Sequence, residues 1–141
     1  MDSAAVARIR SSFELLSPMG NELIDTFYQF LFAAAPSVRA LFPSEMKAQK
    51  DHLLAAVGLV VKHADNLPSL DAALMEMGAR HVKYGARPEH YPVVRDNMIA
   101  ALSQTAGQAW NAQLAADWTT ALNAVAAAMI KGAEQAQSRA A

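Results

Sequence analysis

Residues 70–84 read LDAALMEMGARHVKY. Its large apolar side chains fall at positions 70, 74, 77 and 84, and His81 belongs to the same series of three- and four-residue steps. Such steps mark one face of an α-helix, which turns about once every 3.6 residues. The spacing therefore predicts a helix with His81 and Tyr84 on the side that faces the core. An imidazole there is either a core side chain with a hydrogen-bond partner or a ligand.

The composition of the chain limits the kinds of protein it can be. Its 141 residues suit one domain over residues 1–141, and the 53% of hydrophobic residues can build a sizeable core. A formal net charge of −1 argues against nucleic acid as a partner, and zero cysteines exclude disulfides, thiolate metal sites and cysteine nucleophiles. Neither a secretory signal nor a run close to the roughly 18 apolar residues of a membrane span is present. The sequence therefore predicts a soluble, cytoplasmic protein that uses neither nucleic acid nor a membrane as a partner.

The chain is expected to be helical throughout. Strand signals are weak, and alanine, the strongest helix former, is abundant. We predict an all-α fold in which prolines and glycines separate the helices. The expected helices cover residues 3–16, about 18–34, about 44–64, 70–84, a segment with Pro92 in its first turn that ends near residue 105, and about 109 or 111 to 135, with a short turn after Pro36. Asp2 or Ser3 is expected to cap the first helix and Ser44 the third, whereas a polar tail from about residue 135 is expected to fray.

No common catalytic motif is present, since the sequence contains no GxSxG, P-loop, GxGxxG or HExxH pattern. No two of its four histidines are three or four residues apart, so no single helix offers a histidine pair for zinc. Three polar groups remain: the inward His81, Gln49 one turn before Leu53 on a core-facing side, and Tyr28 on an aromatic-rich helix. Gln49 either reaches water at the rim or uses its amide inside. Tyr28 either packs with its hydroxyl at the surface or donates into a pocket.

A lone imidazole holds a metal when the metal brings its other ligands. Haem does so, because the porphyrin supplies four nitrogens and the protein supplies one histidine. A flat, mostly apolar disc also needs a slot lined by leucine, valine and phenylalanine, and this sequence has such residues on both sides of the expected slot. These residues favour a haem site, and a helical domain without a cofactor remains the alternative.

The sequence resembles bacterial globins, specifically the single-domain globins and the globin domains of flavohaemoglobins. The resemblance runs roughly from residue 6 to residue 130. Its densest parts are FYQFLFAAAPSVRALFP (27–43), NLPSL (66–70) and RHVKYGARPEHYPVV (80–94). The resemblance implies the globin fold, a three-over-three helical sandwich, around a pocket for haem b, iron protoporphyrin IX.

The resemblance also assigns roles to individual residues. His81 falls on the proximal histidine that binds haem iron, and Phe42 falls on the phenylalanine that packs against the haem plane. Tyr28 and Gln49 fall on the distal tyrosine and glutamine, with Leu53 one turn later, above the iron. Both distal side chains can donate hydrogen bonds to bound dioxygen, whose outer atom carries partial negative charge.

At the rim and on the proximal side, the sequence follows the family pattern less closely. Tyr91 falls on the tyrosine that helps to fix the proximal histidine in flavohaemoglobins. Those proteins also place a glutamate there, whereas this chain has Ala133 at that position with Glu134 beside it. His52, and Arg80 and Lys83 beside His81, are candidates for the haem propionates, with solvated surface residues as the alternative. A further alternative for His52 is a competing distal ligand.

Three functions remain open from the sequence. The first is reversible binding of dioxygen, with CO and NO as further ligands, in a monomer or weak dimer. The second is nitric oxide dioxygenation, an enzymatic activity that would rely on an external reductase. The third is a globin-like module without haem, which predicts that His81→Ala leaves the colour and stability of the protein unchanged.

Overall fold

The computed structural model describes residues 1–140, and within them every regular element is a helix. The all-α prediction is therefore confirmed. In this part of the chain no helix combines the length and the hydrophobicity that crossing a membrane requires. The α-helices are α1 (Ser3–Leu16), α2 (Gly20–Ala34), α3 (Lys47–Lys62), α4 (Asp71–Lys83), α5 (His90–Ala106) and α6 (Ala112–Ala140). Short 3-10 helices lie between them at η1 (Ser17–Met19), η2 (Pro36–Leu41), η3 (Ala64–Leu70) and η4 (Gly107–Ala109).

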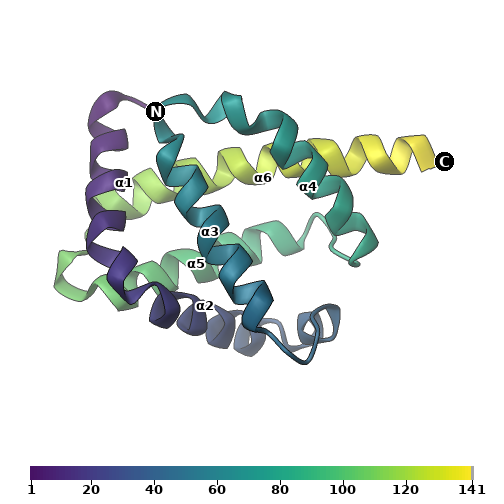
Figure 1. Cartoon of the computed structure of the whole chain (residues 1–141), viewed down its shortest axis with the longest axis horizontal. Coiled ribbons are helices and arrows are strands. Elements are labelled where there is room, and N and C mark those ends of the chain that lie inside the picture. Colours follow the sequence, from purple (N-terminus) through teal and green to yellow (C-terminus); the bar gives the residue numbers. More distant parts are fainter. Residues whose placement is uncertain (141) are drawn as a thin grey trace.

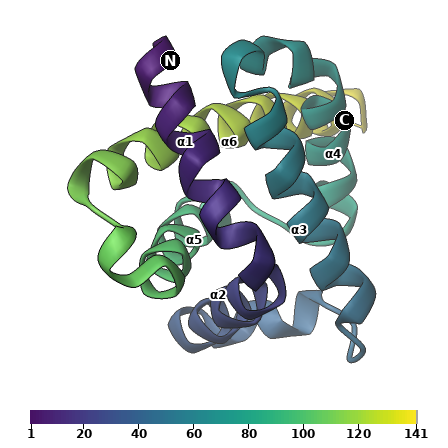
Figure 2. The same ribbon diagram turned by 60° about the vertical axis from the view of Figure 1, so that its left-hand side comes forward.

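The helices form two crossed layers, with α1, α3 and α4 over α2, α5 and α6 (Figure 1). Helices α1 and α4 pack on α6, and α2 packs on α5. The turned view shows α1 and α3 in front of α5 and α6 (Figure 2). Large side chains from both layers fill the space between them and are almost completely buried: Ile9, Leu16, Leu23, Ile24, Phe27, Met98, Leu102 and Trp118.

The helix ends follow local chemistry, with two corrections to the prediction. The Asp2 carboxylate accepts from the Ala5 N–H at 2.8 Å and caps α1, as expected. Ser44 does not cap α3, because this helix begins at Lys47, whose N–H donates to the Glu45 carboxylate at 3.1 Å. The last helix does not end near residue 135 as expected, since α6 continues to Ala140 and extends past α4 (Figure 1). Alanine-rich sequence favours this continuation.

Helix α4 buries most of the face that its sequence predicts. Leu70, just before the helix, and Leu74 are each only 6% exposed, and Met77 is half-buried. Tyr84 is 57% exposed, so its predicted inward position is wrong. The helix ends at Lys83 and the chain turns at Gly85, whose φ of +92° suits glycine. The inward series therefore stops at His81.

Candidate functional site

His81 lies in the last turn of α4 and is half-buried. Its Nδ1 atom is 2.7 Å from the carbonyl oxygen of Met77. Because a carbonyl can only accept, Nδ1 carries the proton in this bond. The other ring nitrogen, Nε2, is then the one with a lone pair for a metal. The hydrogen bond to the Met77 carbonyl thus leaves Nε2 as the ring nitrogen that could coordinate a metal.

A bare metal ion has no complete site in the described residues. No group of three or more histidine, cysteine, aspartate or glutamate side chains there could hold one. Any metal bound through His81 must therefore bring most of its ligands with it, as a porphyrin does.

A polar pair of buried Tyr28 and half-buried Gln49 joins α2 to α3. Tyr28 on α2 is only 4% exposed, and Gln49 Nε2 on α3 donates to its hydroxyl oxygen at 3.3 Å. Burial raises the pKa of Tyr28 above its ordinary value, and the hydrogen bond from Gln49 lowers it by less. The hydroxyl therefore stays protonated and keeps its own hydrogen for another acceptor. The alternative with a surface hydroxyl on Tyr28 does not hold, whereas half-buried Gln49 lies at the rim and also uses its amide toward Tyr28.

The Tyr28 ring is part of a cluster of three aromatic rings. The ring centroids of Tyr28, Phe32 and Phe42 lie 5.5 to 5.6 Å from one another, and Phe42 meets both other rings edge to face. Such contacts stabilise beyond the area they bury and fix ring orientation. Phe42 is half-buried, so part of this ring remains uncovered by the described chain.

Arg39 holds the loop that carries Phe42, a role that the sequence did not reveal. Its Nη1 atom donates to the carbonyls of Phe42 at 3.3 Å and Pro43 at 3.0 Å, and Nη2 donates to that of Ser44 at 3.4 Å. Its guanidinium also lies 5.3 Å from the centroid of the Phe32 ring. A lone arginine in a short turn gives no pattern that would have predicted these contacts.

Several apolar side chains near the predicted site are only partly covered. Leu53 on α3, Met77 on α4 and Phe42 are half-buried and pack against the buried core. The backbones of α3 and α4 do not pack along each other, unlike those of α4 and α6. This arrangement suits a flat apolar group between the two helices.

The remaining candidates lie at the edge of this region or away from it. His52 is exposed, and Arg80 is exposed with Nη1 3.8 Å from a Glu76 carboxylate oxygen. Tyr91 is half-buried, and burial raises its pKa. No hydrogen bond of the described residues joins Tyr91 to His81, whose ring contacts Tyr84 edge to face at 5.5 Å. The proximal ring is therefore held by a backbone carbonyl.

Ala133 and Glu134 add no carboxylate to the proximal side. Ala133 is half-buried and Glu134 is exposed on α6.

Comparison with known proteins identifies the family. A model of the globin family matches residues 25–129. The chain belongs to the globin family. Among solved structures, a bacterial globin from Campylobacter jejuni has a TM-score of 0.85 at 21% identity, covering 97% of this globin and 99% of that chain. The predicted globin fold is therefore confirmed.

Relatives of this globin are found among flavohemoproteins and small globins. The flavohemoprotein of Vibrio cholerae is 29% identical over 116 residues, which are 80% of this globin and 29% of that protein. An uncharacterized globin-like protein of Aquifex aeolicus is 30% identical over 96 residues, which are 68% of this globin and 69% of that protein. This globin therefore spans about three-tenths of the length of the Vibrio cholerae flavohemoprotein.

A second solved structure has a comparable fold. It is an engineered carbene transferase from Rhodothermus marinus, provisionally named a nitric oxide dioxygenase, with a TM-score of 0.83. Its identity to this globin is 24%, over 99% of this chain and 96% of that one. At this identity the likeness shows the fold alone.

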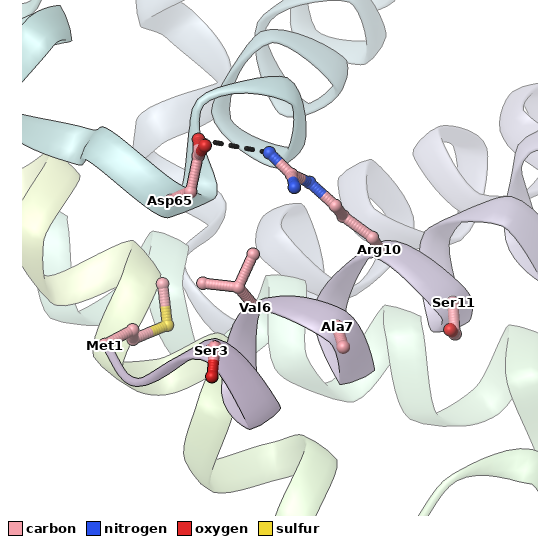
Figure 3. Close-up of a pocket in the computed structure, with 7 residues that line it drawn as sticks. All are labelled: Met1, Ser3, Val6, Ala7, Arg10, Ser11 and Asp65. Carbon is pink, nitrogen blue, oxygen red and sulfur yellow. Dashed lines mark hydrogen bonds and ion pairs between the residues drawn. The ribbon is translucent and has the colours of Figure 1, made fainter.

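Two surface hollows of this globin lie outside the His81 region. One, of about 580 Å³, opens beside the start of α1 and includes Val6 (Figure 3). There Arg10 Nη2 pairs with the Asp65 carboxylate at 3.1 Å (Figure 3). The other, of about 330 Å³, lies between α2 and the start of α3, where Lys50 Nζ meets the Asp25 carboxylate at 2.9 Å. The Lys50–Asp25 pair fastens α3 to α2 next to the Tyr28–Gln49 bond.

Proposed function

We propose that this globin binds haem b through His81 Nε2 and reversibly binds dioxygen, with CO and NO as further ligands. The hydrogen bond from His81 Nδ1 to the Met77 carbonyl carries the proposal, because it orients the ring and leaves Nε2 as the coordinating atom. The family and the flavohemoprotein relatives support a haem protein. Half-buried Phe42 and Leu53 fit the faces of a porphyrin, and Tyr91 is proposed to pack on the proximal side.

The chain's own residues would favour a polarised ligand on the side away from His81. A bound haem would supply an iron atom able to bind dioxygen. The Tyr28 hydroxyl would donate to this ligand, while the Gln49 amide holds the oxygen of that hydroxyl. Phe42 and Leu53 exclude water, which strengthens a hydrogen bond in the pocket. We propose His52 and Arg80 as contacts of the propionates at the solvent edge, since both side chains are exposed.

The proposal is tested by visible absorption of the ferric, dithionite-reduced and CO-treated protein. A strong Soret band that shifts with CO is expected in the parent, and His81→Ala should lose five-coordinate ferrous haem. His63→Ala, at the end of α3, is the matched control and should behave as the parent. A His81→Ala protein with the parent's spectra would overturn the assignment, and a parent without a Soret band after hemin addition would leave the haem-free module.

Nitric oxide dioxygenation is a second candidate, favoured by the name of the structurally similar Rhodothermus marinus protein. In this reaction one NO, one dioxygen and one electron give one nitrate, and a reductase must supply the electron. The hydrogen bonds that hold dioxygen also stabilise negative charge that develops during the reaction. In the test, the oxygenated protein is mixed with NO. Nitrate formation is then followed while a reductase and NADH supply electrons. Sustained turnover would support the enzyme, and a single oxidation without turnover would support the reversible binder.

A further inference from the structure

The crossing of α4 and α6 is unusually close and depends on two buried glycines, one on each helix. A Cβ atom on Gly78 would overlap the carbonyl oxygen of Met129, and one on Gly132 would overlap that of Met75. Gly78 thus lies against the α6 backbone three residues before Gly132, and Gly132 lies against the α4 backbone three residues before Gly78. Glycine is unfavourable inside helices, so close backbone approach gives a physical reason for both positions.

The two obstacles are backbone atoms, which distinguishes this crossing from the close contact at Gly20. At Gly20 an added Cβ would meet the side chain of Leu54 at 2.7 Å, and a flexible side chain can move aside. The carbonyls of Met75 and Met129 are fixed in helical hydrogen bonding. An added methyl at Gly78 or Gly132 must therefore move one helix relative to the other.

The crossing is linked directly to the His81 ring. The carbonyl that accepts from His81 Nδ1 belongs to Met77, and Gly78 supplies the nitrogen of the same peptide unit. That unit is planar and rigid. A displacement at Gly78 therefore moves the acceptor of the His81 hydrogen bond, and His81 itself lies less than one turn further along α4.

We propose that the Gly78–Gly132 crossing is a positioning device for His81, which sets how deep α4 lies on α6 and hence where Nε2 meets the iron. The inference rests on the proposed haem ligation. It adds a second set of positioning residues, on α6, which do not touch the haem. The backbone contacts of α6 then do what side-chain hydrogen bonds to a proximal histidine do elsewhere, namely fix the ring.

The test compares three glycine-to-alanine variants. Gly78→Ala and Gly132→Ala force the helices apart, whereas Gly58→Ala on α3 meets only the Phe13 ring at 3.9 Å and is the matched control. The readouts are the iron–histidine stretching band of the reduced protein by resonance Raman and the rate of CO association. In both crossing variants the band should shift and the CO rate should change about fivefold or more, the lower end of ordinary coupling between sites. Gly58→Ala should match the parent in both.

A second experiment distinguishes the positioning of His81 from a purely structural role of the crossing. It separates the iron ligand from α4. In His81→Gly supplied with free imidazole, the iron ligand is no longer part of the helix. Gly132→Ala should then have no effect on the iron–imidazole band or on CO association. An equal effect in this background would overturn the positioning role, because the change would not travel through His81.

The remaining outcomes also decide the question. If Gly78→Ala and Gly132→Ala keep the parent's band and CO rate, the inference fails while haem ligation by His81 stands. If both remain unfolded even with hemin, which stabilises the folded state by binding it, the crossing serves folding and the inference is rejected. A parent chain that binds no hemin would overturn both the inference and the proposed function.

Discussion

At the scale of single residues, we expect Tyr28 and Gln49 to have different roles toward a bound ligand. The Gln49 amide donates to the Tyr28 oxygen, so the hydroxyl hydrogen of Tyr28 points elsewhere. The sequence left open which of the two is the main donor to a bound ligand. The direction of this bond favours Tyr28 as donor and Gln49 as the residue that orients it.

Replacement of Tyr28 should therefore have the larger effect on a bound ligand. Tyr28→Phe removes the donor and keeps the ring contacts, so dioxygen should dissociate roughly tenfold faster, as the loss of about 1.4 kcal/mol of hydrogen bonding implies. Stopped-flow displacement of dioxygen by CO measures the rate. Tyr84→Phe changes an exposed tyrosine and serves as the control. An unchanged rate in Tyr28→Phe would assign the donor role to Gln49.

At the scale of elements, the Arg39 side chain on η2 holds the loop that follows this helix. Arg39 reaches three successive carbonyls, which a lysine cannot do, because an ammonium lacks the planar fork of the guanidinium. Arg39→Lys should loosen Phe42 and speed hemin loss roughly fivefold, for about 1 kcal/mol of lost hydrogen bonding. Transfer of hemin to an excess of an apo-acceptor measures the rate.

The control for this variant makes the same arginine-to-lysine substitution on another helix. Arg95→Lys on α5 alters an arginine that pairs with its neighbour Asp96 and with Asn123. Its hemin loss should match the parent's. If Arg39→Lys also matches the parent, the three carbonyl contacts do not hold the loop against the haem.

The start of α1 allows a simpler prediction. Asp2→Ala removes the acceptor for the Ala5 N–H and should lower the free energy of unfolding by about 1 kcal/mol. Asp2→Ser keeps an oxygen that can cap and should recover most of this loss. Urea unfolding followed by circular dichroism measures all three proteins. Equal midpoints for Asp2→Ala and the parent would show that α1 frays without consequence.

The helices could be predicted from the sequence, because their signals are local. Apolar spacing located α4, and Pro92 lies in the first turn of α5 as expected. Local signals failed where a helix end has several chemically similar choices. Glu45, and not Ser44, accepts the first free N–H of α3, and Tyr84 falls just beyond the last turn of α4.

The site was partly predictable for the same reason. His81 and Gln49 are polar residues on apolar faces, which sequence spacing can detect. The Tyr28–Gln49 bond and the Gly78–Gly132 crossing join residues far apart in the chain, and no local pattern encodes such contacts. The resemblance to globins placed Tyr28 and Gln49 together, but it did not reveal the crossing.

At the scale of the whole molecule, α1 and α6 are joined by polar groups next to the buried Trp118. Trp118 Nε1 donates to the Ser12 hydroxyl at 3.0 Å, and that hydroxyl donates to the Ile9 carbonyl at 2.8 Å. One residue before Trp118, Asp117 is 5% exposed and accepts from Arg8 Nε at 2.6 Å. These contacts join the first and last helices, so their loss would affect the cooperative unfolding of both layers.

The Arg8–Asp117 pair should make the stability of the whole molecule depend on acid pH. The hydrogen bond from Arg8 lowers the pKa of Asp117 more than burial raises it. A carboxylate with a lowered folded pKa adds stability above its unfolded value of about 3.9, and this contribution is lost as pH falls through the folded pKa. Urea midpoints should therefore be lower for Asp117→Asn than for the parent at neutral pH and converge as the medium is acidified below about pH 4. Asp71→Asn, which changes an exposed carboxylate at the start of α4, should follow the parent's curve throughout. Parallel curves for Asp117→Asn and the parent would mean that the ionised pair does not stabilise the fold, because the whole difference would then come from altered packing at Asp117.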